Sequence, residues 1–135
     1  MTQTTKIAII EDDSTIAQMY RMKFQSEGFD VEVAYDGASG VEMVSKHMPD
    51  MLLLDLQMPE MNGVEALKRI RQLPKGQMVP VIILTNLGRQ EAPNDLSHLG
   101  IDVDDYIVKA DLTPRQVVDQ VKKTLGTRRS NAQSE

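Results

Sequence analysis

Short apolar runs alternate with amphipathic stretches along this 135-residue sequence, and this alternation limits the possible folds more than any other feature. A short apolar run bounded by polar residues is typical of a buried strand, whereas apolar residues at intervals of three and four are typical of a helix packed on one side. The predicted strands are Lys6–Ile10, Val31–Ala34, Met51–Leu54, Val81–Leu84 and Val103–Val108. We therefore expect a mostly parallel five-stranded sheet with helices on both faces.

Helices are expected between these strands and after the last one. The first begins near Ser14, its expected N-cap, and ends at Gly28, because serine favours the start of a helix and glycine its end. The others are expected at Ala38–Met48, Val64–Leu73, Gly88–Leu99 and Pro114–Gly126, with Pro93 making the fourth helix short or irregular. Residues 127–135 contain one apolar residue and are expected to form a disordered tail after a single domain of residues 1–126.

The composition disfavours several classes of protein. Fifteen Lys and Arg against twenty Asp and Glu leave a net charge of −5, which argues against a nucleic-acid-binding surface. The chain has no cysteine, so disulfides and thiolate metal sites are excluded. The N-terminus lacks the apolar segment of a signal peptide, and no apolar run approaches the length of a membrane span. We therefore expect a soluble cytoplasmic protein without membrane insertion.

Polar side chains follow four of the five predicted strands. They are Glu11, Asp12 and Asp13 after the first strand, Asp55 after the third, Thr85 after the fourth and Lys109 after the fifth. In open parallel sheets, ligands bind at the carboxyl ends of the strands, near the point where the strand order reverses. With the flavodoxin-like order 2-1-3-4-5 these four strands are neighbours, so the polar groups converge. Each residue alone has a structural explanation, such as Asp12 or Asp13 capping the next helix, and the hypothesis depends on their combination.

The expected crevice combines carboxylates with an ammonium and a hydroxyl. Facing carboxylates raise one another's pKa unless a cation neutralises them, and oxygen ligands without His or Cys suit Mg²⁺ or Mn²⁺. Because Mg²⁺ is commonly bound by one or two carboxylates together with phosphate oxygens, this combination predicts a phosphoryl-binding site. One of the carboxylates is then a candidate nucleophile.

Four motifs closely resemble those of receiver domains in two-component response regulators. They are Ile-Ile-Glu11-Asp12-Asp13, Leu-Leu-Leu-Asp55-Leu-Gln-Met-Pro59-Glu-Met-Asn-Gly63, Ile-Leu-Thr85 and Asp-Asp-Tyr106-Ile-Val-Lys109. The resemblance extends from about Lys6 to Gly126. It implies a flavodoxin-like (βα)5 fold and a signalling switch that accepts a phosphoryl group from a histidine kinase or a histidine phosphotransfer protein. Such a protein assists its own phosphorylation and dephosphorylation and is not an enzyme with a separate substrate.

The resemblance also implies which residues bind the metal and the phosphoryl group. Asp55 would be the phosphoacceptor. Asp13 and Asp55 would bind Mg²⁺ directly, and Asp12 would act through a metal-bound water. The backbone carbonyl of Gln57 would complete the protein ligands, and Glu11 would be a bystander.

A further set of residues would couple phosphorylation to a change of shape. Lys109 would neutralise the oxygens of the transferred phosphoryl group. The Thr85 hydroxyl would then hydrogen-bond a phosphoryl oxygen, and Tyr106 would move into the vacated space. Physically this is a two-state element biased by one new charge.

The sequence departs from the family pattern after Lys109. The family usually has a proline there, preceded by a cis peptide bond, but this chain has Ala110. A cis bond before alanine costs about 2.5–4 kcal/mol, so either the fold imposes it or the loop follows a trans path.

Two alternative functions remain open from the sequence. Haloacid-dehalogenase-like phosphatases also use an aspartate after an apolar strand, but they need a second acid two residues later, where this chain has Gln57. The second alternative is a pseudo-receiver that binds partners without being phosphorylated. The combination of Asp12, Asp13, Asp55, Thr85 and Lys109 argues against it.

The expected output is a protein–protein contact. A DNA-binding effector domain needs several tens of residues, and the sequence after the last predicted helix is much shorter, so direct binding to nucleic acid is not expected. The switch residues Thr85 and Tyr106 flank the helix expected at Gly88–Leu99. We therefore expect that helix, the strand before Lys109 and the last helix to form the surface that controls a downstream partner or homodimerisation.

Overall fold

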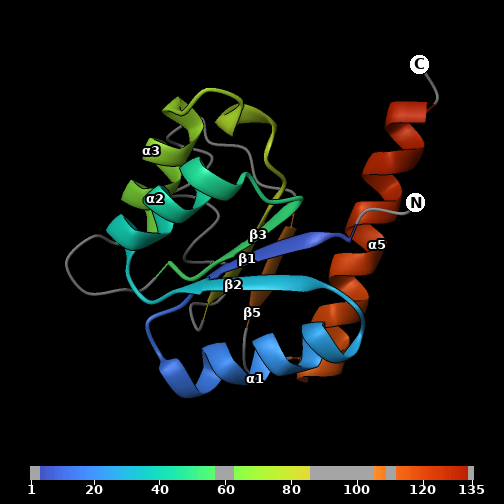
Figure 1. The fold of residues 1–135 in the computed structure, drawn as a ribbon. Coiled ribbons are helices and arrows are strands. Elements are labelled where there is room, and N and C mark those ends of the chain that lie inside the picture. The colour runs from blue at the N-terminus through green and yellow to red at the C-terminus, as the bar shows by residue number, and fades with distance from the viewer. Residues whose placement is uncertain (1–3, 57–62, 86–104, 109–111, 134–135) are drawn as a thin grey trace.

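Five parallel strands form one sheet in the order β2-β1-β3-β4-β5, as the sequence predicts (Figure 1). This computed structural model describes residues 4–56, 63–85, 105–108 and 112–133. The strands are β1 (Lys6–Ile10), β2 (Asp30–Ala34), β3 (Met51–Leu54), β4 (Val81–Thr85) and β5 (Asp105–Val108). They lie within a residue of their predicted bounds wherever both ends are described.

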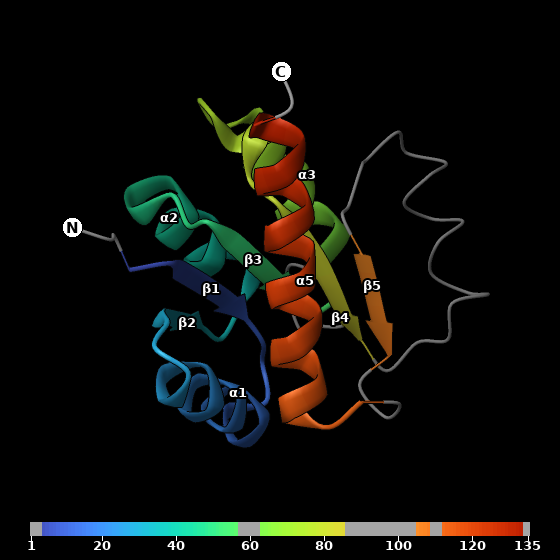
Figure 2. The same cartoon turned by 90° about the vertical axis from the view of Figure 1, so that its right-hand side faces the viewer.

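Helices cover both faces of the sheet. They are α1 (Ser14–Ser26), α2 (Gly37–His47), α3 (Gly63–Gln72) and α5 (Pro114–Gln133), with a 3₁₀ turn η1 at Gly76–Met78. Figure 2 shows α1 and α5 on one side of the sheet and α2 and α3 on the other. The helix expected at Gly88–Leu99, together with Pro93, lies outside the described residues.

The two faces of the sheet carry separate hydrophobic layers, because successive side chains of a strand point to opposite faces. Ile7 and Ile9 pack with residues of α1 and α5. Ala8 and Ile10 pack with residues of α2 and α3. This explains why the β1 and β3 sequences are apolar at nearly every position, since both of their faces are buried.

The helix ends agree with the expected capping chemistry, except at the start of α1 and at the end of α5. The N-cap is Asp13 and not the expected Ser14, which is the first helical residue. Gly28 follows the end of α1 with φ +91°, in the left-handed region that favours glycine. At the start of α5 the Gln116 N–H donates to Thr113 Oγ1 at 3.3 Å, and the Thr113 N–H donates to the Gln116 side chain at 2.8 Å.

Helix α5 extends beyond its predicted end at Gly126. It continues to Gln133, so residues 127–133 are helical and not the disordered segment expected from their composition. Gly126 does not adopt a positive φ, and no proline follows it, so nothing in the backbone stops the helix there. None of the helices in the described part of the chain has the length and hydrophobicity that a membrane-spanning segment requires.

Candidate functional site

The carboxyl ends of β1 and β3 lie side by side in the middle of the sheet. Their register pairs Ile10 with Leu54, so the next residues along the two strands are Glu11 and Asp55. The Glu11 N–H donates to the Ala34 carbonyl at 3.0 Å, and the Asp55 N–H donates to the Ile10 carbonyl at 2.9 Å. These bonds prolong both strands by one residue and fix the backbone from which the two acids extend.

Three carboxylates gather at this edge of the sheet. Oxygen atoms of Glu11, Asp12 and Asp55 all lie within 4.8 Å of one another. Glu11 is fully buried and Asp55 is 3% exposed, whereas Asp12 is exposed. Two of the three carboxylates are therefore shielded from solvent, and the side on which Asp12 lies is open to a ligand.

This donor set fits a hard divalent cation. Negative charges at such separations repel one another, the more so when two of them are buried, and a cation between them removes that repulsion. All the donors are oxygens, which Mg²⁺ and Mn²⁺ prefer. The exposed position of Asp12 leaves room for the water molecules or phosphate oxygens that complete the coordination of Mg²⁺.

Asp13 lies outside this group, contrary to the expectation that it binds the metal directly. Its Oδ1 accepts a hydrogen bond from the Ile16 N–H at 3.1 Å and so caps α1. Its own N–H donates to Glu11 Oε2 at 3.3 Å. The structure therefore places Asp13 as the cap of α1, and it is Glu11 that lies with Asp12 and Asp55 in the carboxylate group.

Glu11 is the site residue that the sequence interpretation treated as a bystander. β1 ends at Ile10 as predicted, and the Glu11 N–H just after it still bonds to the Ala34 carbonyl of β2, which holds Glu11 beside the neighbouring strands. The signal was in the sequence, because aligning the last apolar residues Ile10 and Leu54 makes Glu11 the neighbour of Asp55. The residues that directly follow Ile10 and Leu54 are Glu11, Asp12 and Asp55, which are the three members of the observed carboxylate group.

For two of the remaining predicted residues the structure gives the position in a strand, and the others lie outside the described residues. Thr85 ends β4, next to β3, and pairs with Val108 of β5. Tyr106 pairs with Ile83 in the same ladder. Lys109, which follows Val108, lies outside the described residues, as do Gln57 and the peptide bond before Ala110.

Gly63 holds the start of α3 against the backbone of the site. Its N–H donates to the Leu56 carbonyl at 2.9 Å. A Cβ at this position would overlap the Asp55 carbonyl oxygen and lie 2.6 Å from Leu56 Cα. The glycine is thus required by close approach of two backbone segments, one of which carries Asp55.

Comparisons with known proteins agree with this geometry. The family model described as "Response regulator receiver domain" matches residues 7–122. Response regulator ArlR of Staphylococcus saprophyticus is 37% identical over 105 residues, which cover 78% of this chain and 46% of that protein. The phosphate regulon transcriptional regulatory protein PhoB of Rhizobium meliloti is 33% identical over 120 residues, covering 89% of this chain and 52% of PhoB. The chain thus spans about half the length of these two relatives.

Solved structures show the same fold. A CheY-like receiver domain from Methanospirillum hungatei superposes with a TM-score of 0.84 at 24% identity, over 96% of this chain and 99% of that one. The receiver domain of the sensor histidine kinase PA1611 from Pseudomonas aeruginosa superposes with a TM-score of 0.78 at 22% identity, over 92% of this chain and 99% of that one. That structure has a magnesium ion coordinated in its active site cleft.

These findings settle the family. Neither the phosphatase nor the pseudo-receiver alternative finds support in them. The strand order, the acidic cluster at the ends of β1 and β3 and the match over residues 7–122 point to one family. The chain belongs to the response regulator receiver domains, the phosphoaccepting switches of two-component systems.

Proposed function

We propose that Asp55 is the phosphoacceptor of this receiver domain. The observation that carries the proposal is the position of its carboxylate, which is 3% exposed and grouped with Glu11 and Asp12 at the end of the central strand β3. Glu11 is fully buried beneath the site, whereas Asp12 is exposed at its rim. The Asp55 side chain is buried and its backbone is held by the hydrogen bond to Ile10, yet it lies beside the solvent-exposed Asp12.

We propose that Asp12 and Asp55 are the direct carboxylate ligands of Mg²⁺ and that Glu11 supports them from below. The carbonyl of Gln57 remains a predicted ligand. Bound Mg²⁺ supplies positive charge that offsets the carboxylates and the oxygens of the incoming phosphoryl group. The receiver domain of PA1611, which has the same fold, holds a magnesium ion in its active site cleft, and this supports the proposal of a metal site here.

The transfer conserves atoms and charge without an added reactant. A carboxylate oxygen of Asp55 attacks the phosphorus of a phosphohistidine, the new P–O bond forms, and the P–N bond breaks. The electron pair of that bond returns to the imidazole nitrogen, which is then free to take a proton from solvent. The protein contributes position and electrostatic stabilisation, as phosphoryl transfer requires.

Thr85, Tyr106 and Lys109 are proposed to convert the new charge into a change of surface. Thr85 is the last residue of β4, the strand next to β3, and Asp55 follows β3. This position is suitable for the proposed hydrogen bond from the Thr85 hydroxyl to a phosphoryl oxygen. Tyr106 lies on the adjacent β5. Lys109 follows β5, and its ammonium is proposed to neutralise the phosphoryl oxygens.

The proposed donor is a histidine kinase or a histidine phosphotransfer protein in the cytoplasm. The proposed output surface comprises the segment after β4, β5 and α5, through which the phosphorylated chain binds a downstream protein or a second copy of itself. ArlR and PhoB are about twice as long as the matched region, so their complete activities are not transferred to this chain.

Mass spectrometry after treatment with acetyl phosphate tests the assignment of Asp55. We expect the mass of one phosphoryl group to be added in the presence of Mg²⁺, and its loss in Asp55→Asn. Asp50→Asn is a matched control, because Asp50 precedes the same strand at its opposite end, where it accepts a hydrogen bond from the Lys6 N–H at 2.8 Å. Full phosphorylation of Asp55→Asn at the wild-type rate would exclude Asp55 as the acceptor.

Beryllium fluoride, which mimics the phosphoryl group, tests the coupling residues. We expect Lys109→Ala to retain its fold and Mg²⁺ binding but to lose the NMR shift change at Tyr106. An equal change in variant and wild type would contradict the role of Lys109. Sedimentation and hydrogen exchange of residues 86–126 with and without the mimic then report whether the output surface responds.

A further inference from the structure

A groove lies between the edge strand β2 and helix α2, on the face of the sheet that α2 and α3 cover. It has a volume of about 380 Å³. Its lining combines the carboxylates of Glu32, Asp36 and Glu42 with Lys46, His47, an aromatic ring and a methionine. Figure 1 shows β2 running along the edge of the sheet, with α2 beside it on that face. The groove therefore has a strand edge on one side and a helix on the other.

The backbone of β2 leaves hydrogen-bonding groups directed at the outside of the sheet. Asp30 and Ala34 bond toward β1, through Asp30 N–H to the Thr5 carbonyl at 2.9 Å and the Glu11 N–H to the Ala34 carbonyl at 3.0 Å. Since backbone groups alternate in direction along a strand, those of Val31 and Val33 point away from β1. Among the described strands β2 pairs with β1 alone. Val33 is partly exposed whereas Val31 is 5% exposed, so an added strand can bond to the outward groups of Val33 without disturbing the existing sheet.

The charged side chains of the groove determine which charge a bound peptide strand should carry. Glu42 is paired with Lys46 at 2.8 Å, and Glu32 lies 3.4 Å from His47, with each of these side chains about half exposed or more. Asp36 adds a third carboxylate, which caps α2 by accepting from the Ser39 N–H at 2.7 Å. Carboxylates thus outnumber the one lysine, which favours a cationic ligand.

We propose that this groove binds an extended basic segment of a partner protein, which adds to the sheet as a strand beside β2. Its backbone bonds to the outward groups of Val33, and a Lys or Arg side chain lies between Glu32 and Glu42. The exposed ring of Tyr35 and the side chain of Met43 contact the aliphatic part of that side chain. A second copy of this chain is a poorer occupant, because its β2 carries Asp30 and Glu32 and repels the same acids here. The inference does not rest on the phosphorylation of Asp55.

Three blocked seven-residue peptides of alternating sequence test the proposal. The first alternates valine with lysine, the second alternates valine with glutamate, and the third repeats the first with N-methyl groups on alternate residues. We expect the first peptide to shift the amide NMR signals of residues 31–36 and 39–47, and the other two to bind at least about tenfold more weakly. N-methylation removes strand pairing while keeping the charge. Equal binding of the first and third peptides would show attraction by charge alone and would overturn strand addition.

Variants of the groove test the same contacts from the side of the protein. Glu32→Gln and Glu42→Gln should each weaken binding of the lysine peptide about two- to fivefold. Glu27→Gln removes the same charge on the opposite face of the sheet and should leave binding unchanged. Val33→Pro removes an outward N–H without touching the bonds to β1 and should abolish the shifts, once circular dichroism shows that it folds. Unchanged affinity in both glutamine variants, or dimers of the free chain that compete with the peptide, would contradict the proposal.

Discussion

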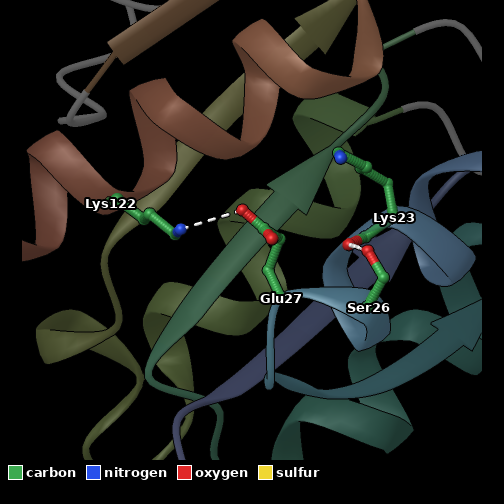
Figure 3. Close-up of polar contacts among 4 residues, drawn as sticks. All are labelled: Lys23, Ser26, Glu27 and Lys122. Atoms are coloured by element: carbon green, nitrogen blue, oxygen red, sulfur yellow. Dashed lines mark hydrogen bonds and ion pairs between the residues drawn. The ribbon is translucent and has the colours of Figure 1, made fainter.

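Lys122 Nζ lies 3.0 Å from Glu27 Oε1, joining α5 to the end of α1 across a separation of 95 residues in the sequence (Figure 3). The hydrogen bond and the charge of Lys122 lower the pKa of the Glu27 carboxyl from its ordinary value of 4.5. Lys23 and Arg115 act in the same direction more weakly, while desolvation opposes them. The pair lies at the surface, over the layer where α1 and α5 pack against the sheet.

This ion pair predicts a pH-dependent part of the stability. Because the folded pKa of Glu27 is lower than the unfolded one, its contribution is fully present above pH 4.5 and is lost as the pH falls through the folded pKa. Wild type should therefore be more stable than Glu27→Gln at pH 7, with the difference vanishing in acid. Urea denaturation at several pH values, with Lys122→Met and the double variant completing the cycle, measures it. A difference that persists below pH 3 would show that packing and not charge distinguishes the variant.

The fold could be predicted because its strands are buried on both faces. Ile7, Ile9, Ala8 and Ile10 alternate between two hydrophobic layers, so β1 has to be apolar at each of these positions and is easy to recognise. The strand order was implied by the resemblance to receiver domains, and that order places the polar strand ends next to one another. Apolar patterning was sufficient to locate the strands, whereas their order depended on the resemblance.

The carboxylate group of the site could be predicted to within one residue along the chain, and the reason for the difference is physical. An acid at a strand end can extend the strand, bind a metal or cap the next helix, and Glu11, Asp12 and Asp13 do not differ enough in sequence to show which does what. Hydrogen bonds distinguish them, since the Glu11 N–H continues the ladder and Asp13 Oδ1 caps α1. The groove beside β2 had no sequence signal, because its lining comes from separate faces of a strand and a helix.

The distinction between Glu11 and Asp13 gives a second prediction. Asp13→Ala removes the cap of α1 and should lower the free energy of unfolding by about 0.5–2 kcal/mol while leaving Mg²⁺ affinity nearly unchanged. Glu11→Gln removes a buried charge from the carboxylate group and should weaken Mg²⁺ binding. Calorimetric titration of both variants is suitable because the chain has no tryptophan to report binding by fluorescence. A larger loss of Mg²⁺ affinity in Asp13→Ala than in Glu11→Gln would restore Asp13 as a ligand.

Gly63 and Gly126 give a matched pair of substitutions. Gly63→Ala forces a methyl group against the Asp55 carbonyl and should slow phosphorylation by acetyl phosphate roughly tenfold or more, because it displaces the acceptor. Gly126→Ala faces open space within α5 and should leave the rate unchanged while stabilising the helix by up to about 1 kcal/mol. Rates measured by intact mass, together with thermal unfolding, separate the two effects. A Gly63→Ala variant with the wild-type rate would show that α3 moves aside without disturbing Asp55.

The crowding of Glu11, Asp12 and Asp55 predicts how the metal changes stability. Without a divalent ion the three carboxylates repel, so Asp55→Asn, which removes one charge with little change of shape, should unfold at a higher temperature than wild type in the presence of a chelator. Saturating Mg²⁺ should reverse the order, since an ion present at a hundred times its dissociation constant stabilises the chain that binds it by about 2.7 kcal/mol and the variant binds it more weakly. Asp50→Asn, at the far end of β3, should follow wild type under both conditions. Thermal unfolding of the three proteins with chelator and with Mg²⁺ measures both effects, and equal stabilisation of wild type and Asp55→Asn by Mg²⁺ would mean that the ion is held without Asp55.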